Sequence, residues 1–474
     1  MKVILIETTS EVYRQNPFSH LDRLLEPLAI EYIGGHLLKV GHAVELIHQL
    51  SQSKEDIVAE VVRKGPDVIG FSCMTYNYKD TVELAEAIKT ELPDVKTILG
   101  GYHVIGMDTS PECFDFVIRG EGEQASEAVL DVVAGKLDIQ NIPGLAFANG
   151  VRWDIPQSRD QAFRPYPPMR LPRKGFLSMS MGENLPDTRL ACVVACRGCP
   201  FRCDFCCTPQ IFPGQRELNT PVQLVSEILK LRDEMGVNTI NIRDETFSNK
   251  TYIRAFCEEM IKSKVNVSWR AFANIGTLDR DSLQLMANAG CHMLFFGIEA
   301  SDIATLQLRR KNFRDINRIM NDVRSAQEVG IFTRAGFIVG HENDTRESFR
   351  RHEEFLLQVM PDEICLSFLT PFPGTPLYQR IKKEGRLLTE DFSKYDCEHP
   401  IINIGIPEAE LIELRNQLYS GFYTSNEWTS HITKRAKERA HETESIERFC
   451  AFMARKLKVS DPCDKIKAPG RVNQ

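Results

Sequence analysis

Three cysteines in one short segment have the spacing of an iron–sulfur site. Residues 197–206 read Arg-Gly-Cys-Pro-Phe-Arg-Cys-Asp-Phe-Cys, so Cys199, Cys203 and Cys206 form a Cys-x3-Cys-x2-Cys pattern. Three thiolates can hold three corners of a four-iron cluster and leave the fourth iron open. An open iron can chelate the amino and carboxylate groups of S-adenosylmethionine (SAM). Reduction of the SAM sulfonium would then release a 5′-deoxyadenosyl radical.

The same spacing occurs a second time in an overlapping set, formed by Cys192, Cys196 and Cys199. Apolar residues alternate around Cys192, which predicts a buried strand over 188–195 with Cys192 and Cys196 on one face. A rigid strand cannot curl three thiols around one cluster, whereas the later set lies in a segment punctuated by Gly and Pro. We therefore expect the later set to bind the cluster, and Cys192 and Cys196 to be small buried residues.

Two alternatives exist for these thiols. A zinc site would need a fourth Cys or His at suitable spacing, and Cys207 is adjacent to Cys206, too close to chelate comfortably. A disulfide framework is disfavoured, because 474 residues can build a core without covalent links and the N-terminus has no secretory signal.

The cysteine segment resembles the cluster loop of the radical SAM superfamily, which commonly has an aromatic residue just before the last cysteine. Phe205 stands there, and the resemblance implies that it contacts SAM. From residue 188 onward, six strand-and-helix units can be counted, as in the partial (β/α)6 barrel of that superfamily. The strands are predicted at 188–195, 238–243, 267–273, 292–298, 332–339 and 363–369.

Active sites of such barrels gather at the C-terminal ends of the strands. The resemblance implies that Asp244 or Glu245 accepts hydrogen bonds from the SAM ammonium, although either carboxylate could instead cap a helix starting near Ser248. Further along, a Gly-Ile-Glu-Ala-Ser sequence ends the fourth strand and a Gly-Phe-Ile-Val-Gly sequence the fifth. They resemble segments that hold the SAM ribose and pass its adenine, which adds Glu299, Ser301 and Gly340 to the predicted SAM contacts.

Residues 1–150 alternate short apolar strands with helical stretches. Strands are predicted at 3–6, 43–47, 67–72, 96–99 and 114–118, with helices at 28–40 and 80–92 between them. This order predicts a doubly wound, parallel, Rossmann-like sheet, whose ligands bind at the carboxyl ends of the strands.

Those strand ends are polar and rich in glycine. They resemble the cobalamin-binding domain that precedes one large class of radical SAM proteins, and the resemblance implies cobalamin contacts at Ser72, Thr75, Gly100, Gly101, His103, Gly120 and Gly122. The Asp-x-His-x-x-Gly sequence that supplies a histidine to cobalt in methionine synthase-like domains is absent. A nucleotide-like domain without a ligand is the alternative, and His103 can equally stabilise its own turn.

The remaining segments complete the predicted organisation. Residues 151–187 are proline-rich and predict a linker, 188–405 the barrel, and 406–474 a helical C-terminal region. Near the C-terminus an apolar stripe at helical spacing is flanked by basic residues; it favours packing on the barrel over contact with an anionic membrane. The stripe comprises Ile446, Phe449, Cys450, Met453 and Leu457.

Composition adds the expected setting. A formal net charge of −7 and 26% charged residues give no reason to expect nucleic acid binding, and no apolar run is long enough for a transmembrane segment. We expect a cytoplasmic protein, where a cluster and free thiols both survive.

The resemblance implies a cobalamin-dependent radical SAM enzyme with three cofactors: a [4Fe–4S] cluster, SAM and cobalamin. The commonest chemistry in that class is methylation of an unactivated carbon or phosphorus of a small-molecule or lipid substrate, with electrons from a donor such as flavodoxin or ferredoxin. One SAM would donate its methyl group to cobalamin, and a second would yield the radical that activates the substrate. Oxidative cyclisation or hydroxylation is the alternative within the class. A non-catalytic cobalamin sensor or carrier is the alternative outside it.

Overall fold

The computed structural model describes residues 1–9, 26–49, 52–157, 167–170, 189–212, 214–313 and 315–438. The chain divides into two compact units. The first comprises 1–174, 198–218 and 370–396; the second comprises 175–197, 219–369 and 397–474. The domain boundaries expected from the sequence remain predictions.

The first unit is built on a mixed sheet. Its seven strands in the described residues have the order β2-β1-β3-β4-β5-β6-β7, and the first five are parallel. These five are β1 (Lys2–Glu7), β2 (Ala43–His48), β3 (Val68–Ser72), β4 (Lys96–Gly100) and β5 (Phe116–Ile118). Each strand coincides with an apolar run in the sequence. The predicted parallel, doubly wound sheet is confirmed.

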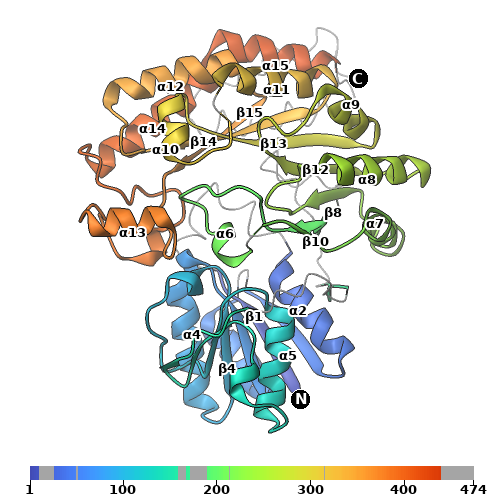
Figure 1. Ribbon diagram of the computed structural model, residues 1–474, viewed down its shortest axis with the longest axis vertical. Coiled ribbons are helices and arrows are strands. Elements are labelled where there is room, and N and C mark those ends of the chain that lie inside the picture. Colours follow the sequence, from blue (N-terminus) through green and yellow to red (C-terminus); the bar gives the residue numbers. More distant parts are fainter. Residues whose placement is uncertain are drawn as a thin grey trace, which may run out of the picture. The chain divides into compact units, whose positions relative to one another are not determined.

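Helices cover both faces of this sheet (Figure 1). On one face α2 (Leu28–Lys39) packs beside α5 (Gly122–Val133), and on the other α3 (Lys54–Lys64) packs beside α4 (Tyr78–Glu91). Short 3-10 turns complete the connections: η2 (Thr75–Asn77), η3 (His103–Gly106) and η4 (Ile139–Asn141). The two faces therefore carry separate hydrophobic cores, as a sheet buried on both sides requires.

The sheet also has an antiparallel edge that the sequence reading missed. Strand β6 (Leu145–Ala148) pairs antiparallel with β5, and β7 (Val151–Arg152) pairs antiparallel with β6. The connecting residues Asn149 and Gly150 have φ values of 48° and 77°. Two residues with positive φ match the right-handed twist of the strands they join, and Asn-Gly is the preferred pair there.

The second unit is built on a parallel sheet. In its described residues six strands have the order β15-β14-β13-β12-β11-β8. They are β8 (Leu190–Val193), β11 (Thr239–Ile242), β12 (Ser268–Ala273), β13 (Cys291–Glu299), β14 (Phe332–Val339) and β15 (Glu363–Phe368). All six predicted barrel strands are confirmed, and so is the partial (β/α)6 barrel.

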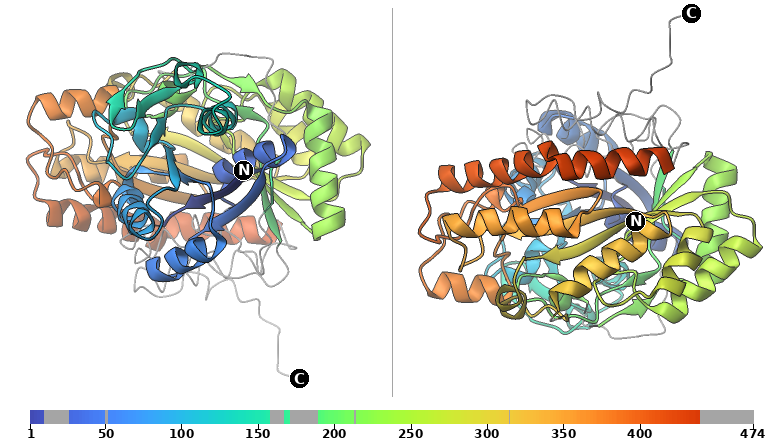
Figure 2. Two further views of the ribbon diagram at one scale, coloured as in Figure 1. Left: turned by 90° about the horizontal axis from the view of Figure 1, so that it is seen from below. Right: turned by 90° about the horizontal axis from the view of Figure 1, so that it is seen from above.

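Helices line the outer face of this sheet in chain order, each packed on the next (Figure 2). They are α7 (Pro221–Met235), α8 (Lys250–Lys262), α9 (Arg280–Asn288), α11 (Ile316–Glu328), α12 (Arg346–Val359), α14 (Glu408–Thr424) and α15 (Asn426–Glu438). A short helix, α10 (Ile303–Leu308), follows β13. The C-terminal region is thus helical as far as it is described. The predicted apolar stripe at 446–457 lies outside the described residues, as does most of the predicted linker.

Five short elements remain in the part of the chain that the structure describes. They are β9 (Cys196–Arg197), α6 (Thr208–Ile211), β10 (Arg216–Glu217), α13 (Pro376–Lys383) and η5 (Phe392–Lys394). Across the described residues, no helix is both long and apolar enough to span a membrane.

Candidate functional site

The three predicted cluster ligands lie in the segment 198–218 of the first unit. Cys199, Cys203 and Cys206 are each half-buried and none is in a disulfide. The Cys206 amide donates to the Cys203 carbonyl oxygen at 3.3 Å, which closes a tight turn. Gly198 starts the loop at φ +83°, and a Cβ there would lie 2.0 Å from the Gly214 carbonyl oxygen. Only glycine fits this position.

The alternative cysteine set has different surroundings. Cys192 lies within strand β8 and is 1% exposed, and Cys196 is 3% exposed. These thiols are part of the packed second unit. The described residues contain no group of three or more His, Cys, Asp or Glu that could hold a single metal ion. A [4Fe–4S] cluster needs no such convergence, because each thiolate binds a different iron atom.

Asp244 closes the end of strand β8. Its two carboxylate oxygens accept the backbone N–H groups of Ala195 at 2.8 Å and Cys196 at 3.0 Å. Burial raises the pKa of this carboxyl well above its ordinary value, although both hydrogen bonds oppose that shift. Asp244 thus fixes the backbone that leads into the cysteine segment, while its neighbour Glu245 is half-buried.

The helix-cap alternative for these carboxylates is wrong. Helix α8 is capped by Asn249, whose side chain accepts the Tyr252 amide at 3.2 Å. Asp244 is 1% exposed, so the half-buried Glu245 is the more accessible of the two carboxylates.

Glu299 ends strand β13 in an unusual backbone conformation. Its φ is +70°, which an L-residue with a side chain adopts at a cost of about 1–2 kcal/mol. One carboxylate oxygen lies 3.1 Å from the buried Lys311 ammonium. A Cβ at Gly297 would come within 2.4 Å of that oxygen. The glycine in the Gly-Ile-Glu sequence therefore makes room for the glutamate side chain.

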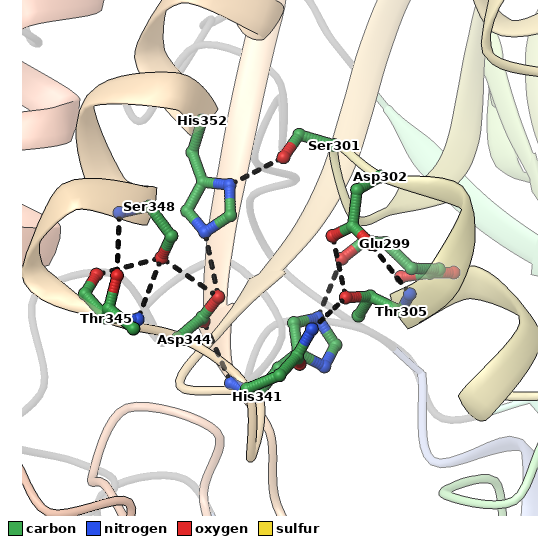
Figure 3. Close-up of polar contacts among 10 residues, drawn as sticks. Glu299, Ser301, Asp302, Thr305, His341, Asp344, Thr345, Ser348 and His352 are labelled. Atoms are coloured by element: carbon green, nitrogen blue, oxygen red, sulfur yellow. Dashed lines mark hydrogen bonds and ion pairs between the residues drawn. The ribbon is translucent and has the colours of Figure 1, made fainter.

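A buried polar network stands behind Glu299 and Ser301 (Figure 3). The Glu299 carbonyl oxygen lies 3.1 Å from Nε2 of His341, and the Ser301 hydroxyl lies 2.7 Å from Nδ1 of His352. Asp344 joins the two histidines, because it accepts the His341 amide at 2.9 Å and lies 3.0 Å from Nε2 of His352. The sequence reading did not find these three residues.

Gly340, predicted beside the adenine, links strand β14 to this network. It directly precedes His341 and has φ +76°, and a Cβ there would lie 3.3 Å from the Phe368 ring. Phe205, the last predicted SAM contact, is half-buried in the cysteine segment of the first unit.

In the first unit, the ends of β3 and β4 are tied together through their backbones. The Cys73 amide donates to the Gly100 carbonyl at 2.9 Å, and the His103 amide donates to the Cys73 carbonyl at 3.2 Å. Gly101 sits between them at φ +101°, where a Cβ would lie 2.3 Å from the Cys73 oxygen. Ser72 ends β3, half-buried, and Thr75 is buried at the start of η2.

Gly100 differs from its neighbour. Its φ is not positive, and among the described residues the nearest atom to a Cβ at this position would be 3.9 Å away. The described part of the fold therefore does not require glycine here. Close approach by another molecule is one reason for glycine at such a position.

His103 is held in an aromatic cage. Its ring lies 4.0 Å from the Tyr78 ring between centroids, tilted by 31°, and meets the Phe392 ring edge-on at 4.8 Å. The residue is 3% exposed, and its Nδ1 has no hydrogen-bond partner among the described residues. Burial lowers the pKa of His103 to about 4, so the ring is neutral at neutral pH.

The glycines after β5 have steric roles as well. Gly120 has φ +102°, and Gly122 begins α5, where a Cβ would lie 2.5 Å from the Ile33 side chain. Arg119, just before them, donates to the carbonyl oxygens of Val104 at 3.1 Å and Met107 at 2.8 Å. This guanidinium joins the β5 end to the turn that carries His103.

Two families match the chain. Residues 19–130 match the B12 binding domain, and residues 193–356 match the radical SAM superfamily. A B12-binding sheet followed by a partial radical SAM barrel defines a class of two-cofactor radical enzymes. The chain belongs to the cobalamin-dependent radical SAM family.

Similar proteins include methyltransferases and cyclases. An uncharacterized methyltransferase of Pyrococcus horikoshii is 27% identical over 84% of this chain and 87% of its own length. An anaerobic magnesium-protoporphyrin IX monomethyl ester cyclase of Rubrivivax gelatinosus is 28% identical over 87% of this chain and 76% of its own. The hopanoid C-3 methylase of Methylococcus capsulatus is 26% identical over 83% of this chain and 76% of its own.

Solved structures share the fold. The cobalamin-dependent SAM radical enzyme OxsB, with aqua-cobalamin and SAM bound, superimposes with a TM-score of 0.67 at 16% identity, covering 94% of this chain and 71% of that one. The methyltransferase TsrM of Kitasatospora setae, with tryptophan and a SAM analogue, gives a TM-score of 0.65 at 17% identity, covering 81% and 76%.

The radical SAM domain implies a [4Fe–4S] cluster and SAM, and the B12-binding domain implies cobalamin. The residues fit these groups. Three half-buried thiols outside any disulfide suit the cluster. Among the described residues, the space beside Gly100 is open and the buried Nδ1 atom of His103 has no partner, and both features suit a large cofactor.

Proposed function

We propose that this enzyme is a methyltransferase that acts on an unactivated carbon or phosphorus of a small-molecule or lipid substrate. The supporting observation is that the Pyrococcus horikoshii relative, named a methyltransferase, matches along 84% of this chain and 87% of its own length. The hopanoid C-3 methylase adds a lipid-modifying relative of similar coverage. A one-electron donor such as flavodoxin or ferredoxin would supply the reducing electron.

The chain's own residues have distinct roles in this proposal. Cys199, Cys203 and Cys206 hold the cluster, and Glu245 accepts from the SAM ammonium. Glu299 and Ser301 bind the ribose hydroxyls, the backbone at Gly340 passes the adenine, and Phe205 packs against SAM. In the first unit, the strand ends at Ser72, Thr75, Gly100, Gly101, His103, Gly120 and Gly122 contact cobalamin. When bound, the cofactors supply radical formation and a transferable methyl group, neither of which a side chain can provide.

The test uses SAM with a trideuterated methyl group. The full-length enzyme, reconstituted anaerobically with cluster and cobalamin, is mixed with labelled SAM and a reductant, and products are followed by mass spectrometry. A methyltransferase should form S-adenosylhomocysteine and 5′-deoxyadenosine, with the label recovered on the extracted cobalamin. Absence of any SAM cleavage after verified cluster assembly would favour the sensor or carrier alternative and overturn the proposal.

Two adjacent thiols offer a matched control for the cluster assignment. Cys206→Ala should lose the cluster's absorbance and most of its iron, and should stop 5′-deoxyadenosine formation. Cys207→Ala removes the next thiol along the same half-buried loop and should retain the iron. Equal iron content in the two variants would refute the assignment of Cys206.

A cyclase is the second candidate, because the Rubrivivax gelatinosus relative is named one and matches along 87% of this chain. The same experiment separates the two functions. A cyclase should release 5′-deoxyadenosine without S-adenosylhomocysteine, and its cobalamin should stay unlabelled.

A further inference from the structure

The backbone at Glu299 needs outside support, because its left-handed conformation is unfavourable for a residue with a Cβ. The support comes from His341, which directly follows strand β14 and is 0% exposed. A carbonyl oxygen can only accept a hydrogen bond, so the Nε2 atom of His341 must carry the proton in the 3.1 Å contact with Glu299. Burial lowers the pKa of His341, which keeps the ring neutral with its proton on Nε2.

The hydroxyl of Ser301 is oriented by a second chain of contacts. Hydrogen bonds from His352 and from the His341 amide hold the pKa of Asp344 below its ordinary value, although burial opposes this. Asp344 is therefore an ionised acceptor, and the Nε2 atom of His352 donates to it over 3.0 Å. The Nδ1 atom of that ring then accepts the Ser301 hydroxyl proton over 2.7 Å. Ser301 is left with oxygen lone pairs to offer another molecule.

The arrangement leaves two acceptors close together in sequence. Lys311 contacts only one oxygen of Glu299, and the second carboxylate oxygen has no hydrogen-bond partner among the described residues. With the Ser301 oxygen, this gives two acceptors, and a ribose diol presents two hydroxyl donors. Asp, His and Ser also form the triad of many hydrolases. Here, however, the network also fixes the backbone of Glu299, which a hydrolase triad has no need to do.

We propose that His341, His352 and Asp344 are positioning residues that present Glu299 and Ser301 as paired acceptors to the ribose hydroxyls of SAM. This inference rests on the proposed function, in which Glu299 and Ser301 bind SAM. None of the three residues touches the ligand in this proposal. His341 sets the backbone of the turn, and Asp344 acts through His352 to set the direction of the serine hydroxyl.

The test is a thermodynamic cycle between side chain and ligand. Dissociation constants for SAM and for 2′,3′-dideoxy-SAM are measured by anaerobic equilibrium dialysis on the cluster-loaded, full-length enzyme without reductant. The wild type should prefer SAM. In His352→Gln, whose amide reaches toward Asp344 but no longer toward Ser301, the preference should shrink by about fivefold, the value of one hydrogen bond. If His352 only stabilises the fold, its replacement would weaken the binding of both ligands equally. The ratio of the two dissociation constants would then be unchanged, which would overturn the inference.

Two further variants keep the test decisive. Ser301→Ala removes the hydroxyl without disturbing the buried histidines, and should give the same reduced ratio even if His352→Gln folds poorly. His352→Asn places an amide near the former Nδ1 position and should recover part of the preference. A wild type that binds SAM and the dideoxy analogue equally would also refute the inference. Failure of the proposed function looks different, since the wild type would then bind SAM but form no S-adenosylhomocysteine under reducing conditions.

Discussion

The strand ends of the two units are built in different ways. In the first unit, backbone groups and glycines form the edge. The one histidine among the predicted contacts lies in an aromatic cage, and its Nδ1 has no partner within the described ranges. In the second, most of the predicted contacts are side chains, and a network of three buried residues holds Glu299 and Ser301. The first edge defines a shape, and the second defines a set of hydrogen bonds.

This difference suits the two ligands that the family implies. Cobalamin is large, so a glycine edge that admits its surface can recognise it over many weak contacts. SAM is small and polar, and its ribose offers few donors, so each acceptor must point the right way. The two edges therefore reduce the free energy of unfolding in different ways. In the first unit the cost comes from unfavourable backbone conformations, and in the second it comes from burying polar groups.

The largest effect should come from Gly101→Ala. The new Cβ would lie 2.3 Å from the Cys73 carbonyl oxygen, at a φ of +101° that alanine rarely adopts. Strain and overlap together should cost about 4 kcal/mol of unfolding free energy and abolish cobalamin binding. Urea unfolding of the apoprotein and cobalamin retention on gel filtration measure the two effects.

Gly100→Ala is the matched control at the next residue. Its Cβ would meet no atom of the described residues closer than 3.9 Å, so the stability of the apoprotein should change by less than about 1 kcal/mol. Cobalamin affinity should nevertheless fall, because the methyl group occupies space that the fold leaves open. If Gly100→Ala binds cobalamin as tightly as the wild type, the shape-based description of this edge is wrong.

The second unit should respond to a change of charge without a change of shape. Asp344→Asn removes a buried carboxylate that accepts from His341, His352 and the Ser348 hydroxyl. The loss should cost about 2–3 kcal/mol of stability, since an amide cannot serve every one of these donors. SAM affinity should fall with it. The midpoint of urea unfolding and the SAM dissociation constant are the measurements.

An exposed aspartate provides the control for this variant. Asp279 caps helix α9 and pairs with Lys250 at the surface. Asp279→Asn keeps a good cap and loses only an exposed ion pair, so stability should change by less than about 1 kcal/mol. If Asp279→Asn and Asp344→Asn lose the same free energy of unfolding, the buried network contributes no more to stability than a surface contact.

The fold was predictable from the sequence because its signals are local. Apolar runs marked the parallel strands of both units, and their order indicated each sheet. The antiparallel edge also had a local signal, the Asn149-Gly150 pair that follows the apolar run 145–148. The hydrogen bonds of Asp244 had no such local signal, because only the folded backbone brings its oxygens to the amides of Ala195 and Cys196.

The candidate site was only partly predictable. Motif resemblance pointed to Glu299 and Ser301, which lie two residues apart at the end of strand β13. His352 lies within helix α12, 51 residues from Ser301, and nothing in its neighbourhood distinguishes it from a packed helix residue. Its role depends on a distance that only the three-dimensional structure supplies. The ligand roles of all these residues remain predictions.

The smallest expected effect concerns His103 and depends on pH. Burial lowers its pKa from 6.5 to about 4, so between these values the unfolded chain binds a proton that the folded chain does not. The wild type should therefore lose stability as the pH falls through this range. Phenylalanine keeps the ring contacts with Tyr78 and Phe392 but cannot be protonated, so His103→Phe should lose about 1–2 kcal/mol less than the wild type between pH 7 and pH 5. Urea midpoints of the apoproteins at both pH values test this, and equal losses would contradict it.

Cobalamin affinity at pH 7 then sharpens the comparison. If His103→Phe binds cobalamin more weakly than the wild type, the imidazole makes one directed polar contact with cobalamin. If the affinity is unchanged, the imidazole serves only to pack the turn.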